Sequence, residues 1–231
     1  MIRAVLFDAA GTLIHLPRGV GWHYREVAAR HGLDLEEKRL GAAFGEAFQN
    51  AGPRAATAGT RPDDDKSWWR NVVRRVLAAC GWDPEAAAFD PIFEDLYAHF
   101  AEPGVWALYP EVPAVLEALH GKYRLGVVSN FDRRLYPVLE HLGVRRYFDA
   151  IVISSEVGAD KPDTRIFAAA LSALGVSAAE AVHAGDHPDQ DWQAAAAAGL
   201  HVYRLNRPDT TLDGLVQFLA PTPGLGRLGR L

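Results

Sequence analysis

Four groups of polar residues carry side chains that suit phosphoryl transfer, and each follows soon after an apolar run. They occupy residues 8–12, 129–130, 160–163 and 185–191. A carboxylate such as that of Asp8 can attack phosphorus and form an aspartyl-phosphate, and other carboxylates can hold Mg²⁺, which takes oxygen ligands. A hydroxyl and a lysine, here Ser129 and Lys161, can hold the phosphate oxygens. The four groups together predict a site for a phosphate and a divalent metal.

These side chains can act together only if the fold brings them to one place. Short apolar runs predict buried strands at 4–7, 125–128, 151–153, 181–184 and 202–205. Amphipathic stretches between them predict helices at 111–121, 132–142, 164–174 and 189–198. Alternating strands and helices indicate an α/β fold, a parallel sheet with helices on both faces. Since ligands bind outside the carboxyl ends of such strands, we expect the polar groups to converge on one edge of the sheet.

One region departs from this alternation and predicts a separate helical module. Between residues 16 and 104 the sequence predicts helices at 22–31, 34–49, 65–80 and 84–100, a loop at 51–64, and no strand. We therefore expect an α/β core formed by 1–15 and 105–220, a helical insert at 16–104 and a loose tail at 221–231. The run Asp63-Asp64-Asp65 predicts a solvated turn before a helix.

Composition and charge narrow the class of protein. The 231 residues are 49% hydrophobic and 23% charged, which is ordinary globular composition. The net charge of −5 lacks the basic character of nucleic-acid binders. No apolar run approaches the ~20 residues of a membrane helix, and the N-terminal residues do not form a signal peptide. A single cysteine, Cys80, excludes an internal disulfide. We expect a cytoplasmic protein that binds neither nucleic acid nor membrane.

The order of the four motifs resembles the haloacid dehalogenase-like (HAD) hydrolases. The matching motifs are Asp-x-x-Gly-Thr-Leu at the first strand, Ser-Asn after the second, Lys-Pro-Asp before the third helix and Gly-Asp-x-x-x-x-Asp after the fourth strand. The resemblance extends over residues 1 to 206 and implies a Rossmann-like core with an inserted all-helical C1 cap. Residues 129–135, 161–167 and Trp68-Trp69 resemble, more narrowly, the branch named haloacid dehalogenase-like hydrolase domain-containing proteins.

The resemblance also implies roles for individual residues. Asp8 is expected to be the nucleophile and, with Lys161, to be catalytic. Mg²⁺ is expected to be the cofactor, and its implied ligands are Asp8, the Ala10 carbonyl, Asp186 and Asp191. The residues implied to hold the phosphate or the substrate are Thr12, Ser129, Asn130 and Lys161. The implied reaction is hydrolysis of a small phosphorylated metabolite.

Ala10 departs from the family pattern. Phosphatases of the family carry an Asp at this position, which protonates the leaving oxygen and later activates water. Losing a positioned acid/base costs on the order of 10²–10⁴ in rate, so the sequence predicts weakened or altered catalysis. Aryl and acyl phosphates, which have good leaving groups, would suffer least. His187, Asp132 and His15 are candidates for a replacement acid.

Three other activities remain open at this stage. One is a catalytically degenerate scaffold that binds phosphate or metal. Another is a phosphonoacetaldehyde hydrolase-like enzyme, which also has Ala at this position but needs a cap lysine; Lys38 and Lys66 are the only lysines in the insert. The third is a 2-haloacid dehalogenase-like enzyme, a class that usually has Tyr there and uses no metal.

Two further groups have a structural interpretation. His183 and His187 are four residues apart, but they straddle a strand end and a loop, so we predict no zinc site. Trp68, Trp69 and Trp82 are predicted to pack in the core of the helical insert.

Overall fold

A five-stranded parallel sheet carries the predicted site. The computed structural model describes residues 1–82 and 86–220. The strands are β1 (Ala4–Phe7), β4 (Arg124–Ser129), β5 (Ala150–Ile153), β6 (Ala181–Gly185) and β7 (His201–Arg204). Their order is β5-β4-β1-β6-β7, and all neighbours are parallel. Every residue of the central strand β1 is fully buried, as expected where helices cover both faces.

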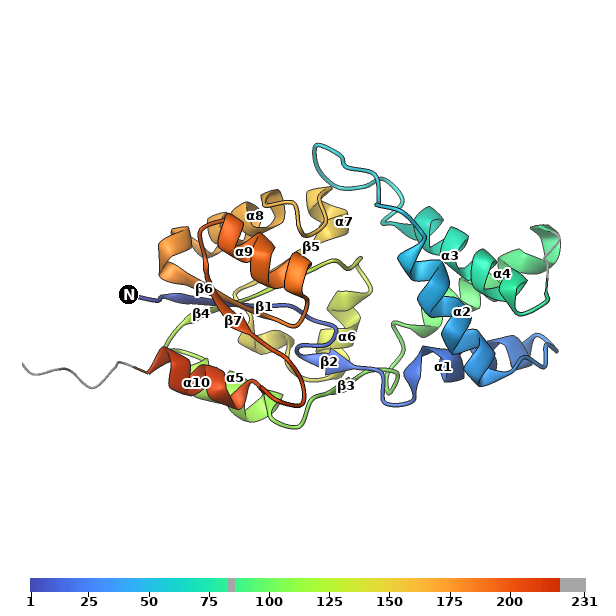
Figure 1. The fold of residues 1–231 in the computed structure, drawn as a ribbon, viewed down its shortest axis with the longest axis horizontal. Coiled ribbons are helices and arrows are strands. Elements are labelled where there is room, and N and C mark those ends of the chain that lie inside the picture. Colours follow the sequence, from blue (N-terminus) through green and yellow to red (C-terminus); the bar gives the residue numbers. More distant parts are fainter. Residues whose placement is uncertain (83–85, 221–231) are drawn as a thin grey trace, which may run out of the picture.

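Two helical layers enclose the sheet (Figure 1). One contains α5 (Val112–Leu119), α6 (Leu135–His141) and α10 (Asp213–Leu219), and the other contains α8 (Arg165–Leu174) and α9 (Ala194–Ala197). Alternate β1 side chains face opposite layers: Val5 and Phe7 pack with the first, Ala4 and Leu6 with the second. The predicted α/β class with a Rossmann-like parallel core is confirmed.

The helices between residues 16 and 104 form a lobe beyond the carboxyl ends of the strands (Figure 1). They are α1 (Gly19–Arg30), α2 (Glu37–Gln49), α3 (Lys66–Ala79) and α4 (Ala86–His99). They share a hydrophobic cluster that includes Tyr24, Val76 and Phe89 and is separate from the two clusters on the sheet. We call this lobe the cap. The exact division at 15/16 and 104/105 stays a prediction.

A small antiparallel pair lies where the chain enters and leaves the cap. It joins β2 (Ile14–His15) to β3 (Ala107–Leu108), and the sequence did not predict it. Two-residue strands carry no readable periodicity, and this pairing depends on contact between distant parts of the chain.

Other differences from the expected elements are local. Helix α10 was not predicted, and the single helix expected at 189–198 is a π-helical turn, η3 (Pro188–Gln193), followed by α9. The remaining short helices are α7 (Ser154–Val157), η1 (Arg145–Tyr147) and η2 (Ala178–Glu180). The start of the helix expected at 84–100 and the tail expected at 221–231 lie outside the described residues. Residues 51–64 contain neither helix nor strand, as predicted.

The prediction that Asp65 is solvated was wrong. Asp65 is 3% exposed, and Arg61 donates to both of its carboxylate oxygens at 3.0 Å. Arg54 lies 3.3 Å from the same carboxylate. Burial raises the pKa of Asp65 to about 6, against the lowering effect of the two guanidinium groups. Asp65 belongs to an acidic run, but Arg54 and Arg61 of the 51–64 loop hold it in a buried ion pair.

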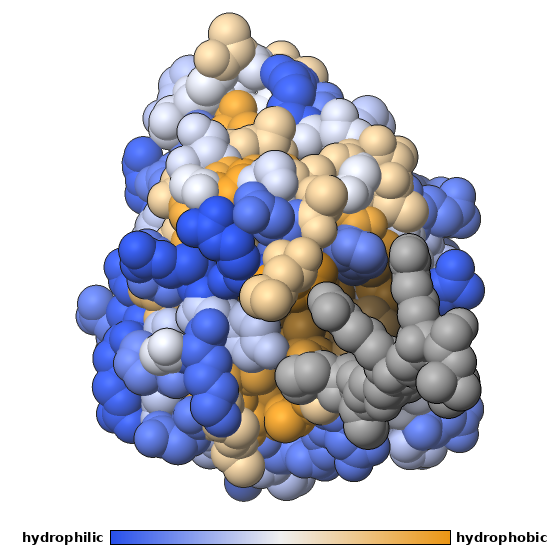
Figure 2. Space-filling view, turned by 90° about the vertical axis from the view of Figure 1, so that its left-hand side faces the viewer, coloured by the Kyte–Doolittle hydropathy of each residue, from blue (hydrophilic) through white to orange (hydrophobic). Residues whose placement is uncertain are grey.

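The face of the molecule where the strands begin lies opposite the predicted site. Figure 2 shows a hydrophilic rim around apolar surface in the middle of this face. The predicted site residues follow the other ends of the strands and do not belong to this face. Within the described residues, no helix combines the length and the apolar character needed to cross a membrane.

Candidate active site

The sheet order places three of the predicted residues side by side. β4, β1 and β6 are neighbours, and Ser129, Asp8 and Asp186 stand at or directly after their carboxyl ends. Asp8 is 7% exposed, and Ser129 Oγ donates to its Oδ1 at 3.1 Å. The expected convergence on one sheet edge follows directly from parallel pairing.

Lys161 lies between two buried carboxylates. Its Nζ donates to Asp8 Oδ1 and to Asp191 Oδ1, both at 2.6 Å, and its side chain is 2% exposed. Burial alone would lower the pKa of Lys161, but the charges of Asp8 and Asp191 outweigh it and hold the pKa above its usual value. Burial raises the pKa of Asp8, against the opposing charge of Lys161. The lysine is therefore a permanent cation beside the predicted nucleophile.

Asn130 fixes the backbone that carries Lys161. Its Oδ1 accepts from the Lys161 backbone N–H at 2.6 Å, and its Nδ2 donates to the Lys161 carbonyl at 2.9 Å. Nδ2 also lies 3.2 Å from Gln190 Oε1. The amide side chain is thus used inside the protein, which leaves the backbone of Asn130 as its means of contact with a substrate.

Asp186 and Thr12 meet across the first turn after β1. The Thr12 hydroxyl donates to Asp186 Oδ1 at 3.2 Å. Gly11, at φ +91°, makes this possible, because a Cβ there would lie 2.8 Å from Asp186 Cγ and in a conformation that other residues avoid. The loss of surrounding water, then the charges of Asp8 and Asp191, raise the pKa of Asp186 to about 6.

Asp191 is mainly a hydrogen-bond partner of Lys161 rather than a group directed at a ligand. Its Oδ1 accepts from Lys161 and from His183 Nε2, the latter at 2.9 Å, and its Oδ2 accepts from the His187 backbone N–H at 2.9 Å. Burial alone would raise the pKa of Asp191, but the His183 hydrogen bond and the charge of Lys161 hold it below its usual range. At Gly185 a Cβ would overlap this carboxylate, so the close approach requires glycine.

The donor set fits a divalent cation. One carboxylate oxygen from each of Asp8, Asp186 and Asp191 lies within 4.8 Å of the others. Three carboxylates beside one lysine leave an excess of negative charge, and all three offer the oxygen donors that Mg²⁺ prefers. Ala10 is exposed, and its carbonyl oxygen accepts no hydrogen bond from the described part of the chain. That oxygen is available as a further donor.

The three candidates for a replacement acid have different surroundings. Asp132 is 1% exposed and accepts from Arg134 and from Trp69 Nε1, so it is fully used in structural contacts. His187 Nδ1 accepts two backbone N–H groups at the start of η3. His15 packs against Tyr109, with ring centroids 4.6 Å apart and ring planes tilted by 34°. Of the three, His15 alone lines the cavity that also contains Ala10.

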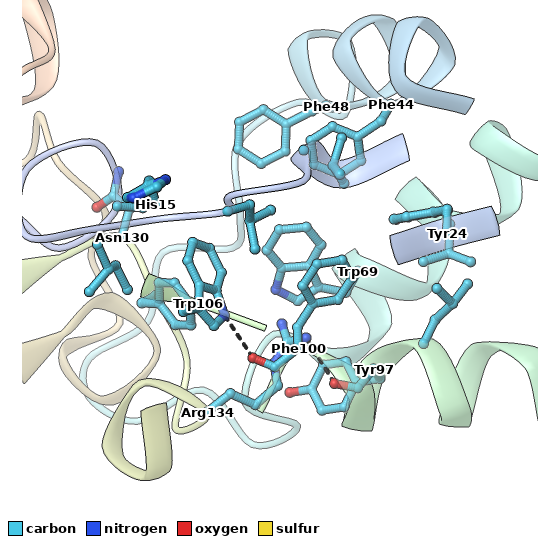
Figure 3. A pocket seen from close by; sticks show the side chains of 18 of the residues that line it. His15, Tyr24, Phe44, Phe48, Trp69, Tyr97, Phe100, Trp106, Asn130 and Arg134 are labelled. Carbon is cyan, nitrogen blue, oxygen red and sulfur yellow. Dashed lines mark hydrogen bonds between the residues drawn. The ribbon is translucent and has the colours of Figure 1, made fainter. Parts of the chain in front are cut away.

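A cavity of about 520 Å³ lies between the cap and the carboxyl edge of the sheet. At the core end it is lined by Ala10, Gly11 and His15, which follow Asp8 in the chain, and by Asn130, which follows β4. Figure 3 shows the aromatic side chains of both lobes around it, from Phe44 and Phe48 of the cap to Trp106 of the core. The volume is that of a small-molecule site.

Sequence reasoning missed part of this site. Trp68, Trp69 and Trp82 do pack against the cap core, as predicted, but Trp69 also lines the cavity and donates to Asp132 of the core at 2.9 Å. The sequence contained no signal for this double role.

Known proteins resemble this chain over nearly its whole length. Haloacid dehalogenase-like hydrolase domain-containing protein 3 of Bos taurus is 34% identical over 222 residues, 95% of this chain and 88% of that protein. Glyceraldehyde 3-phosphate phosphatase of Methanopyrus kandleri is 29% identical over 222 residues, 90% of this chain and 85% of that protein.

A solved structure and a family model agree with these relatives. The HAD-hydrolase YfnB of Bacillus subtilis, bound to magnesium, has a TM-score of 0.76 at 18% identity, covering 94% of this chain and 98% of that one. The family model described as haloacid dehalogenase-like hydrolase matches residues 2–199. The motifs, the fold and these matches agree, and the chain belongs to the haloacid dehalogenase-like hydrolases.

Proposed function

We propose that this hydrolase is a Mg²⁺-dependent phosphatase that acts on a small phosphorylated molecule through an aspartyl-phosphate on Asp8. One observation carries the proposal: the two oxygens of Asp8 have different surroundings. Oδ1 accepts from Lys161 and Ser129, whereas no hydrogen bond within the described part of the chain uses Oδ2. The carboxylate is therefore fixed by one oxygen and has the other available for attack.

The reaction proceeds in two displacements. Oδ2 of Asp8 forms a bond to phosphorus while the bond to the leaving oxygen breaks, and that oxygen departs with the electron pair. Water then attacks phosphorus, the bond from phosphorus to Asp8 Oδ2 breaks with its electron pair returning to the carboxylate, and inorganic phosphate leaves while the proton of the water passes to solvent. Lys161 and Ser129 hold the carboxylate and neutralise charge on the phosphate oxygens, and the cap limits the access of bulk water to the cavity.

The metal would be held by Asp8, the Ala10 carbonyl and Asp186, with Asp191 at the edge of the set. When bound, Mg²⁺ supplies charge that screens the phosphate from the attacking carboxylate. Asp191 Oδ1 already accepts from Lys161 and His183, and its Oδ2 accepts from the His187 backbone N–H, so we assign Asp191 mainly to positioning Lys161. The relative named as a glyceraldehyde 3-phosphate phosphatase supports a phosphorylated substrate.

Position 10 limits the chemistry. The alanine side chain can neither protonate a leaving oxygen nor activate water, so the enzyme is expected to favour esters whose alcohols leave readily. The same residue favours the second candidate function, a scaffold that binds phosphate or metal without turnover.

Cys80 is buried and unpaired, which suits a reducing compartment, and we place the protein in the cytoplasm.

The test is an assay of purified protein with p-nitrophenyl phosphate and acetyl phosphate, with Mg²⁺ and with EDTA. Asp8→Asn, which keeps the shape of the side chain, is the matched variant. Mg²⁺-dependent turnover that disappears in Asp8→Asn is the expected result. A folded protein that binds Mg²⁺ but shows no turnover above Asp8→Asn would refute the phosphatase and favour the scaffold.

A further inference from the structure

We infer that the group esterified to the phosphate is an uncharged aryl group, so that the substrate class is an apolar aryl phosphate. The inference rests on the proposed phosphatase and specifies its substrate. It follows from two separate observations, the walls of the cavity and the residue at position 10.

The cavity presents ring faces rather than polar groups. Among its lining side chains, Trp69 Nε1 donates to Asp132 at 2.9 Å, Trp106 Nε1 donates to the Phe100 carbonyl at 2.9 Å, and Tyr97 OH lies 3.3 Å from the Asp64 carbonyl. These polar tips are satisfied inside the protein, which leaves the ring faces for the ligand (Figure 3). Among the lining groups of the described chain, the Tyr24 hydroxyl and the His15 ring make no hydrogen bond, so the several hydroxyls of a sugar would lose their water and find few partners there.

The two cations that line the cavity are already neutralised. Arg134 donates to both oxygens of Asp132, at 2.8 and 2.6 Å, and its guanidinium lies 3.8 Å from the centre of the Tyr97 ring. Arg54 lies 3.3 Å from Asp65 and 3.6 Å from Asp160. Arg134 is therefore fully paired. Arg54 has its charge balanced by Asp65 and Asp160, although its buried Nε makes no hydrogen bond in the described part of the chain. A carboxylate or second phosphate on the substrate would have to compete with these carboxylates for Arg54.

The chemistry at position 10 selects the same class independently. Ala10 lines the cavity at its core end, where the leaving oxygen must lie. With no acid on that side chain, we expect the oxygen to depart as an anion and take its proton from water, unless His15 of the same cavity supplies one. An aryl oxide tolerates this because the ring stabilises its charge, whereas a sugar alkoxide does not. The electron pair of the broken P–O bond leaves with the aryl oxide, and Asp8 Oδ2 forms the new bond.

The experiment compares esters with phenolic leaving groups of similar acidity. We expect kcat/KM for 2-naphthyl phosphate to exceed that for O-phosphotyrosine about 10- to 100-fold, as burial of a larger apolar group implies, and to exceed that for glycerol 3-phosphate by more. Phe48→Asp places a charge in the apolar wall and should lower the ratio of naphthyl to acetyl phosphate turnover about tenfold. Phe218→Asp is the matched control, because Phe218 is similarly exposed, 51% against 42%, but lies on α10 outside the cavity.

Equal use of O-phosphotyrosine or glycerol 3-phosphate, or the same effect from both Phe variants, would overturn the inference. A binding measurement separates this failure from failure of the phosphatase itself. 2-Naphthylmethylphosphonate, which has no scissile P–O bond, should bind at least tenfold more tightly than methylphosphonate in calorimetry. If acetyl phosphate is not hydrolysed, the phosphatase proposal fails, and the phosphonate pair still decides the character of the cavity. Equal binding of the two phosphonates would overturn the aryl assignment.

Discussion

Restoring a carboxylate at position 10 is the most informative change to this enzyme. Ala10 is exposed and lines the cavity beside Gly11, so an Asp there would project toward the leaving oxygen without displacing core atoms. The nearby carboxylates of Asp8, Asp186 and Asp191 would raise its pKa. A raised pKa favours the protonated form that a general acid needs.

The expected gain depends on the leaving group. A positioned acid contributes on the order of 10²–10⁴ in rate, or about 3–5 kcal/mol in the barrier. Ala10→Asp should therefore raise kcat/KM for glycerol 3-phosphate by two orders of magnitude or more. For 2-naphthyl and acetyl phosphate, whose leaving groups depart without protonation by an acid, the gain should be below about tenfold. The slope of log kcat/KM against leaving-group pKa should flatten accordingly.

The assay uses wild type, Ala10→Asp and Ala10→Asn in parallel, at saturating Mg²⁺. Ala10→Asn matches the shape of Asp but cannot carry the proton, so it should leave the slope unchanged. The reasoning fails if Asp and Asn give the same gain, or if the gain is uniform across leaving groups. A uniform gain would mean that position 10 affects binding of the phosphate or metal rather than proton transfer.

Three further predictions test the surroundings of the site. Lys161→Met leaves two buried carboxylates without their cation and should lower the unfolding free energy by about 3–5 kcal/mol at pH 7 in urea titrations; a loss below about 1 kcal/mol would contradict the buried triad. Asp186 has a folded-state pKa of about 6 against an ordinary 3.8, so the folded metal-free protein holds this proton more tightly than the unfolded chain. Unfolding free energy in EDTA should therefore fall as the pH rises from about 4 to 6 and then level off, and Asp186→Asn should remove that slope. Gly158→Ala would bring a Cβ within 2.8 Å of the Thr57 carbonyl and should release the 51–64 loop to limited proteolysis, whereas Gly175→Ala, at φ +65° with open space around it, should not; equal cleavage of both variants would contradict this docking.

The sequence predicted the parts of the molecule that depend on local pattern. All four residues of β1 are apolar, as expected for a strand whose two faces are both covered by helices. A pattern this local can be recognised from the sequence. Once the strands are parallel and adjacent, Asp8, Ser129 and Asp186 must share an edge. The motif at each strand end was therefore enough to predict that these side chains lie together.

What the sequence could not give depends on contacts between distant segments. Asp65 is buried because the 51–64 loop brings two arginines to it, and nothing in an acidic run predicts that. Asp191 supports Lys161 because a π-helical turn directs its carboxylate inward, whereas an α-helical reading of 189–198 does not fix that direction. Trp69 has spacing typical of a core residue, and its place in the cavity depends on how the cap meets the core.

The energetics of the buried charges favour an active enzyme over an inert scaffold. Asp8, Lys161 and Asp191 are each less than 10% exposed, and desolvation is the largest influence on the pKa of all three. Apolar residues of similar volume in place of such a buried ionic group often leave a fold as stable or more stable, so the fold itself does not need the charges. A scaffold that only held a phosphate could use exposed cations at lower cost. Buried charges are of most use where charge develops on phosphorus and water is excluded, and the proposed reaction at Asp8 would meet both conditions.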